Sequence, residues 1–300
     1  MLARPKTRPF PSSSRGELAV SYTGRTPAVS DRFSGCPADS VRVLQFTDTH
    51  LYRDADRTLL GLNTQQSFEE VLVRARAQHW PADLVLATGD LVHDHSLEGY
   101  QRLRETLATL GVPGYWLPGN HDDPRLMRAA LQRSGASDPR SVRVKGWQII
   151  LLDSHLEGSD AGRVAPAELE RLEEDLERFS DHHALVCLHH PPVLIGSRWM
   201  DAIGLQNAEE LLALLDRHRQ VRAVLWGHIH QEFLGERRGM LLLGTPSTCF
   251  QFKPNRADFE VDSEPPGYRW LVLHADGRVE TGVERLADFP VEINMASTGY

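Results

Sequence analysis

Short apolar runs alternate with stretches of helix-spaced apolar positions along most of the chain. The run VRVLQF at residues 41–46 predicts a strand, because it is short, apolar and followed by polar residues. Apolar side chains at helical spacing over residues 64–79 predict a helix, and Ser67 with Glu70 offers a capping-box pattern near its start. The stretch DLVLATGD at residues 83–90 then returns to a strand pattern. This alternation predicts an α/β protein.

The same alternation continues toward the end of the chain. Further helices are expected over residues 97–110, from Pro124 with Asp123 as its cap, from Pro166, and after Asn207. Further strands are expected within GYWLPGNHDD, ALVCLHH and VRAVLW. Hairpins are expected to turn at Lys145-Gly146 and at Asp276-Gly277.

The composition suggests one domain with a tail at each end. Residues 1–39 are rich in Pro, Ser, Arg and Gly without periodicity, so we expect a disordered N-terminal extension there. No linker-like composition interrupts residues 40–290, which we expect to form a single domain. Residues 291–300 are then a C-terminal tail.

Charge and cysteine usage limit the partners and the location. The formal net charge of -8 repels polyanions, so we do not expect nucleic acid as a partner. A small anion could still bind where metal ions supply positive charge. No apolar run approaches the roughly 20 residues of a membrane span, so we expect no membrane partner. Three scattered cysteines show no disulfide or zinc spacing, which favours a cytoplasmic location. The sequence does not indicate an oligomeric state.

Five apolar strands end in side chains that can bind metal. The segments are FTDTH at 46–50, TGD at 88–90, PGNHD at 118–122, LHHPP at 188–192 and WGHIH at 226–230. Open α/β sheets place their ligand crevices beyond the carboxyl ends of strands, where all five segments fall. Residues two apart on an extended chain point the same way, so the pair Asp48 and His50 and the pair His228 and His230 are each expected to converge.

Each segment alone has a simpler interpretation as a strand cap, a turn or an Asx-turn. Together the five favour a metal site. Two divalent cations roughly 3.5 to 4 Å apart require a bridging carboxylate. Asp90, which lies between the other candidates in sequence and follows the small Gly89, is the predicted bridge. Imidazole with carboxylate and amide oxygen suits iron, manganese or zinc better than calcium.

The motifs D-x-H, G-D, G-N-H-D, H-H-P and G-H-x-H in this order resemble those of the calcineurin-like metallophosphoesterases, over about residues 41–286. The resemblance implies a four-layer α/β/β/α sandwich of two mixed β-sheets flanked by helices. It is closer to one branch, the bacterial 3′,5′-cyclic-AMP phosphodiesterases of the CpdA type. The stretches that carry this closer resemblance are QFTDTHL, LGLNT, WLPGNHDD, GHIHQE, GTPSTCFQFKP and the terminal STGY.

The resemblance implies hydrolysis of 3′,5′-cyclic AMP to 5′-AMP by a hydroxide that bridges two divalent or mixed-valence metal ions. By motif, Asp48, His50 and His230 would hold one ion, Asn120, His189 and His228 the other, and Asp90 would bridge them. His121 would be catalytic, donating to a phosphate oxygen or to the leaving 3′ oxygen. The residues expected to meet the substrate are His50, Asp90, Asn120, His121 and His230.

Two positions near the motifs leave alternatives open. His189 is taken as the ligand because it stands two residues before the first aligned proline, and His190 is then a supporting or packing residue. In many relatives an aspartate three residues after the bridging one orients the catalytic histidine, but here that position is His93. Asp94, Asp122 or neither could be the orienting partner, and the loop around His93 is equally compatible with a plain polar loop.

Motifs that bind metal do not fix the substrate. A metallophosphoesterase of the same fold could act on another diester or monoester, such as a glycerophosphodiester or a nucleotide. A non-catalytic scaffold of this fold is a further alternative, although the complete set of candidate ligands argues against it. Selectivity between cyclic AMP and cyclic GMP is open for the same reason.

Overall fold

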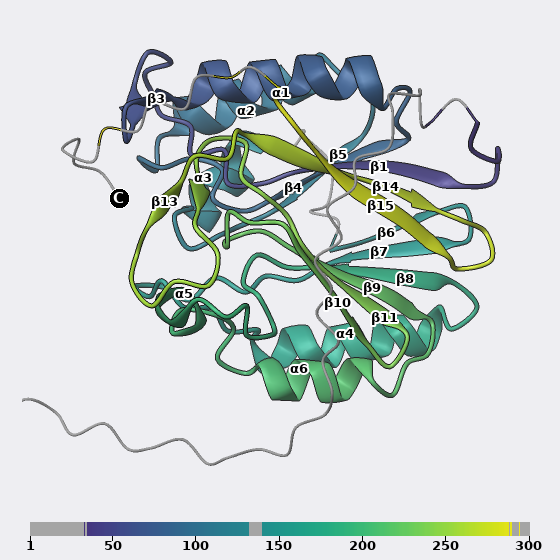
Figure 1. The fold of residues 1–300 in the computed structure, drawn as a ribbon. Coiled ribbons are helices and arrows are strands. Elements are labelled where there is room, and N and C mark those ends of the chain that lie inside the picture. Colours follow the sequence, from purple (N-terminus) through teal and green to yellow (C-terminus); the bar gives the residue numbers. More distant parts are fainter. Residues whose placement is uncertain (1–32, 34, 132–139, 288, 290–293, 295–300) are drawn as a thin grey trace, which may run out of the picture.

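Two β-sheets pack face to face, and helices cover both outer faces (Figure 1). The computed structural model describes residues 33, 35–131, 140–287, 289 and 294. The five-stranded sheet has the order β15 (Val279–Arg285), β14 (Gly267–Leu273), β1 (Val41–Phe46), β4 (Leu84–Thr88) and β5 (Gly114–Leu117). The six-stranded sheet has the order β10 (Phe233–Arg237), β11 (Met240–Gly244), β9 (Val221–Trp226), β8 (His183–Cys187), β7 (Trp147–Leu151) and β6 (Ser141–Val144).

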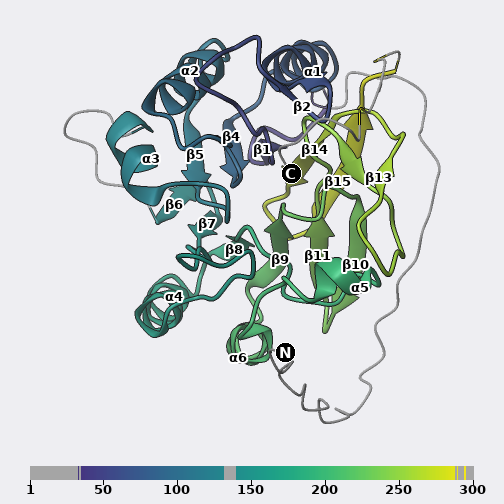
Figure 2. The same ribbon diagram turned by 90° about the vertical axis from the view of Figure 1, so that its left-hand side faces the viewer.

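The helices form the two outer layers (Figure 2). The five-stranded sheet is covered by α1 (Thr64–Gln78), α2 (Leu97–Ala108) and α3 (Pro124–Leu131). The six-stranded sheet is covered by α4 (Pro166–Arg178) and α6 (Ala208–Leu215), with the short α5 (Arg198–Asp201) at one end. Two-stranded ribbons pair β2 (Thr58–Leu59) with β3 (Leu62–Asn63) and β12 (Gln251–Phe252) with β13 (Val261–Asp262). The four-layer sandwich expected from the resemblance is confirmed.

Successive side chains of a strand point to opposite faces of its sheet, and in this way they form the apolar layers. In β1, Val41 and Val43 face the layer between the two sheets, whereas Leu44 and Phe46 face the layer under the helices. A third apolar layer lies between the six-stranded sheet and its helices. Three layers of buried side chains therefore separate the four layers of backbone.

The central strands run parallel, while the outer pairs are antiparallel. β1 pairs in parallel with β4, and β4 with β5, whereas β14 joins β1 antiparallel. In the other sheet β7, β8, β9 and β11 are parallel. The carboxyl ends of β1, β4, β5, β8 and β9 are therefore directed toward one end of the sandwich.

Most expected local signals are confirmed, and one is wrong. Both hairpins turn at the expected dipeptides, and the Asp123 carboxylate accepts from the backbone N–H of Arg125 at 2.8 Å as the cap of α3. The expected capping box of α1 does not form. The Asn63 side chain caps this helix instead, and the Ser67 hydroxyl donates to the carbonyl of Thr248.

The chain ends lie largely outside the described residues, so the extension 1–39 and the tail 291–300 stay predictions. Phe33 is buried in the apolar layer under α1 and α2, and the backbone N–H of Asn294 donates to the carbonyl of Leu60 at 2.8 Å. Among the described residues, no helix is long and apolar enough to cross a membrane.

Candidate active site

The residues that follow β1 and β9 meet between the two sheets. Asp48, His50 and His230 each offer a ligand atom, and these atoms lie within 4.8 Å of one another. His230 Nε2 is 3.4 Å from Asp48 Oδ1 and 3.3 Å from His50 Nε2. All three side chains are fully buried. The resemblance assigns these three residues to one ion, and the structure brings their ligand atoms together.

The residues after β4, β5 and β8 form the adjoining half. His189 Nε2 lies 3.2 Å from both Asp90 Oδ2 and Asn120 Oδ1. The rings of His189 and His228 lie side by side, with centroids 5.1 Å apart. The Nε2 atom of His228 is buried with no hydrogen-bond partner among the described residues. Asp90 Oδ2 is also 4.0 Å from His50 Nε2, so this carboxylate stands between the two halves. We call Asp48, His50, Asp90, Asn120, His189, His228 and His230 the donor cluster.

The backbone reaches this arrangement in a way that the sequence did not predict. Asp48, His50, Asp90, His228 and His230 have φ angles of 53°, 44°, 51°, 66° and 46°. The expectation of an extended chain beyond β1 and β9 is therefore wrong, because these residues adopt the left-handed conformation. For a non-glycine residue this conformation costs on the order of 1 kcal/mol. Backbone hydrogen bonds hold it, among them Asp48 N–H to Gly89 O at 3.0 Å and His50 N–H to Asp90 O at 2.9 Å.

Two glycines allow the loops to approach so closely. A Cβ on Gly119 would lie 2.1 Å from Asp90 Oδ1, and one on Gly89 would lie 2.4 Å from His189 Nδ1. Gly89 also has a φ of +92°, which only glycine adopts readily. Any side chain at either position would push Asp90 or His189 out of the donor cluster.

Backbone carbonyls orient two of the histidines. His189 Nδ1 is 2.8 Å from Thr88 O, and His230 Nδ1 is 2.8 Å from Phe250 O. Because a carbonyl can only accept, the hydrogen of each neutral ring stays on Nδ1. The Nε2 lone pairs then face the donor cluster, as the lone pairs of metal-binding histidines do.

The charge state of the donor cluster also suits a cation. Burial lowers the pKa of His50 and of His228 well below the ordinary value, so both imidazoles are neutral near pH 7. Burial alone would raise the pKa of the Asp90 carboxyl, but His189 and His121 hold it well below its usual range. Burial likewise opposes protonation of His189, yet Asp90 and Asp48 outweigh it and raise its pKa to about 9. His189 would give up that proton to act as a ligand, beside the carboxylates of Asp48 and Asp90. The donor cluster therefore fits two neighbouring metal ions.

Comparison with protein families identifies the kind of site. Residues 41–232 match the family described as calcineurin-like phosphoesterase. The chain belongs to the calcineurin-like phosphoesterases. It is 42% identical over 271 residues to the 3′,5′-cyclic adenosine monophosphate phosphodiesterase CpdA of Pseudomonas aeruginosa, covering 90% of this chain and 99% of that protein. It is 44% identical to CpdA of Escherichia coli K12, covering 87% of this chain and 95% of that protein.

Solved structures support the fold of this calcineurin-like phosphoesterase. A dimetal phosphatase from Danio rerio aligns with a TM-score of 0.56 at 15% identity, covering 82% of this chain and 98% of that one. A purple acid phosphatase from yellow lupin aligns with a TM-score of 0.60 at 13% identity, covering 85% of this chain and 53% of that one. At such low identity the likeness concerns the fold alone.

Asp122, one candidate for orienting His121, fastens two loops of this phosphoesterase together. Its buried carboxylate accepts from the backbone N–H groups of Leu91 and Val92 after β4 and of Gly119 after β5. It also accepts from the Tyr100 hydroxyl at 2.9 Å. Asp94, the other candidate, accepts from the backbone N–H groups of Arg53 and Ser96. The ring of His93 stacks on that of His121.

The network around Asp122 predicts a large loss of stability on its removal. Asp122→Ala would leave three backbone N–H groups without their acceptor, and we expect the free energy of unfolding to fall by about 3 kcal/mol. Tyr100→Phe removes only the hydroxyl and should cost about 1 kcal/mol. Urea unfolding of both variants in EDTA, where metal binding cannot contribute, measures the difference. Equal losses in the two variants would contradict this role of Asp122.

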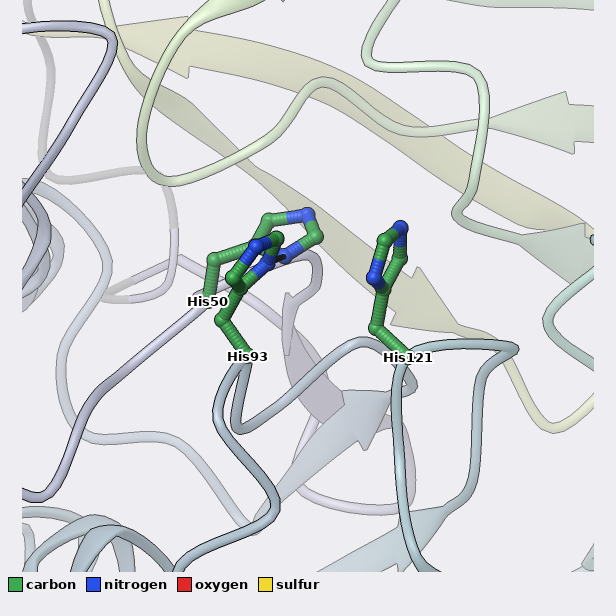
Figure 3. Close-up of side chains that lie close together, drawn as sticks. All are labelled: His50, His93 and His121. Carbon is green, nitrogen blue, oxygen red and sulfur yellow. Dashed lines mark hydrogen bonds between the residues drawn. The ribbon is translucent and has the colours of Figure 1, made fainter. Parts of the chain in front are cut away.

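Two histidines outside the donor cluster are now placed. His190 lies behind His189, with ring centroids 5.0 Å apart, and its Nδ1 is 2.8 Å from the Ser154 hydroxyl. The ligand atoms of His189, His190 and His228 lie within 4.8 Å of one another, so the choice of His189 as the ligand and of His190 as a supporting or packing residue stays a prediction. His93 contacts His50 and His121 (Figure 3), so the segment after Asp90 is more than a solvated loop. In the sequence, only the position of His93 three residues after Asp90 pointed to a role near His121.

Proposed function

We propose that the protein hydrolyses 3′,5′-cyclic AMP to 5′-AMP at the donor cluster. One observation carries the proposal: the expected ligands and His121 all lie together, in a chain that covers nearly the whole length of relatives named as cyclic-AMP phosphodiesterases. The substrate is therefore proposed to be a small cyclic nucleotide. Exclusion of nucleic acid and membranes, and a cytoplasmic location, stay predictions of the sequence.

We assign the donor cluster to two metal ions. Asp48, His50 and His230 would hold one, Asn120, His189 and His228 the other, and Asp90 would contact both. Once bound, the two ions would supply positive charge for the phosphate and lower the pKa of a nearby water. The mixture of imidazole and carboxylate favours iron, manganese or zinc, and does not distinguish among them.

His121 is proposed as the proton donor. Its backbone N–H donates to Asp90 Oδ1 at 2.9 Å, and its ring stands edge-on to His50 with centroids 5.1 Å apart. The side chain is half-buried beside the donor cluster, so it can reach a bound phosphate. In the reaction, the water oxygen bonds to phosphorus and gives up a proton to solvent, the P–O3′ bond breaks, and the 3′ oxygen receives a proton from His121, which solvent then replaces. The ring opens to 5′-AMP.

The first test is the identity of the product. Purified, manganese-loaded protein should convert 3′,5′-cyclic AMP to 5′-AMP, and an EDTA-treated sample should not. Chromatography of the nucleotides separates 5′-AMP from 3′-AMP, which would report cleavage of the wrong ester bond. Absence of any product from protein with metals bound would contradict the proposal and direct attention to other phosphodiesters.

A further inference from the structure

We propose that His93 is a positioning residue that holds both the metal ligand His50 and the proton donor His121. The inference rests on the proposed function for the role of His121. His93 is half-buried in the segment between β4 and α2, and its backbone N–H donates to the carbonyl of Leu51 at 2.8 Å. This bond fixes the segment against the loop that carries His50.

The first contact orients His50. His93 Nδ1 is 3.1 Å from His50 Nδ1, while His50 Nε2 faces His230 Nε2 at 3.3 Å within the donor cluster. A ligand that presents the Nε2 lone pair must carry its hydrogen on Nδ1. His50 therefore donates to His93, whose own hydrogen lies on Nε2. His93 does for His50 what backbone carbonyls do for His189 and His230.

The second contact orients His121. The rings of His93 and His121 are stacked, with centroids 4.9 Å apart and planes 21° from parallel (Figure 3). Tyr52 also lies against His93, with centroids 5.2 Å apart. Aromatic pairs at these separations favour defined ring orientations. The stack restricts rotation of His121, so its ring nitrogens keep a fixed direction relative to the donor cluster.

The two contacts use different parts of the side chain, so substitutions can separate them. His93→Asn places an amide oxygen where Nδ1 stands, which keeps an acceptor for His50 and removes the ring. His93→Phe keeps a ring for His121 and removes the acceptor. His93→Ala removes both. The control is His95→Asn, because His95 is exposed two residues further on and asparagine tolerates its φ of 52°.

The test combines manganese affinity, measured without substrate, with steady-state kinetics on cyclic AMP at saturating manganese. We expect His93→Phe to weaken manganese binding about 10- to 100-fold and to keep most of kcat once loaded. We expect His93→Asn to bind manganese like the wild type and to lose about 10-fold in kcat with little change in KM. His93→Ala should show both losses, and His95→Asn neither.

The manganese affinities of the His93 variants test the positioning role of His93 even if cyclic AMP is not the substrate. No hydrolysis by the wild type would contradict the proposed function, whereas manganese binding would still report on His50. Unchanged manganese affinity in both His93→Phe and His93→Ala would overturn the positioning role. Equal losses of affinity and kcat in all three His93 variants would also overturn it, because they would indicate a general disturbance of the fold.

Discussion

Asp90→Ala is expected to lose both the bound metal and turnover, with kcat/KM reduced by well over about 100-fold. Supporting residues of metal sites typically contribute 10- to 100-fold, and a carboxylate between two ions should contribute more. Asp90 stands 3.2 Å from His189 and 4.0 Å from His50, so its removal takes a carboxylate away from histidines in both halves of the donor cluster. Metal content by mass spectrometry and kcat/KM for cyclic AMP measure the two effects.

Asp94→Asn is the matched control for Asp90. Asp94 is an exposed carboxylate four residues further on. Its Oδ1 accepts from the backbone N–H of Ser96 and its Oδ2 from that of Arg53, so asparagine keeps one of these two surface hydrogen bonds. This variant should keep its metal and its activity. A fully active Asp90→Ala protein would refute the assignment of Asp90 as the bridging ligand.

His121→Ala is expected to keep its metals while kcat falls about 10²- to 10⁴-fold, the range for loss of a general acid. The contacts of the donor cluster survive, because the link from residue 121 to Asp90 uses the backbone N–H. The loss should be much smaller for bis(p-nitrophenyl) phosphate, whose p-nitrophenolate leaving group needs no proton. Kinetics on both substrates, with metal content determined in parallel, test the assignment.

The outcome for His121 separates two roles. Loss of metal from His121→Ala would make His121 a ligand. An equal loss of kcat on both substrates would argue against proton donation to the leaving oxygen. His95→Asn again serves as the control, because it alters an exposed histidine in the adjoining segment.

The position of the site was predictable because strands end where their apolar runs end. The pairs Asp48 with His50 and His228 with His230 follow such runs directly, and parallel pairing of β1 with β4 and of β8 with β9 brings their ends together. Order along the chain therefore predicted which residues share an edge of one sheet, whereas the packing of the two sheets against each other brings the two sets together.

The remaining details depend on contacts between segments far apart in sequence. Ser67 fits a capping box by spacing, but its hydroxyl donates to the carbonyl of Thr248, and the side chain of Asn63 caps the helix. The role of Asp122 was equally hidden, because three of its partners are backbone N–H groups, which carry no sequence signature. The sequence does not show whether His93 supports other residues or lies in a polar loop. The contacts of its ring with the rings of His50 and His121 show this.

The left-handed backbone at five of the seven donor positions has a consequence for protein engineering. At each of these positions glycine, or in part asparagine, would relieve backbone strain in the metal-free protein, while histidine or aspartate is retained for what it binds. Thermal stability and activity therefore pull in opposite directions at these positions. In a library selected for thermal stability in the presence of chelator, we expect asparagine rather than glycine to replace Asp48 and Asp90, because it tolerates the left-handed conformation and leaves no cavity, and the catalyst would be lost. Selection with metal present would preserve it.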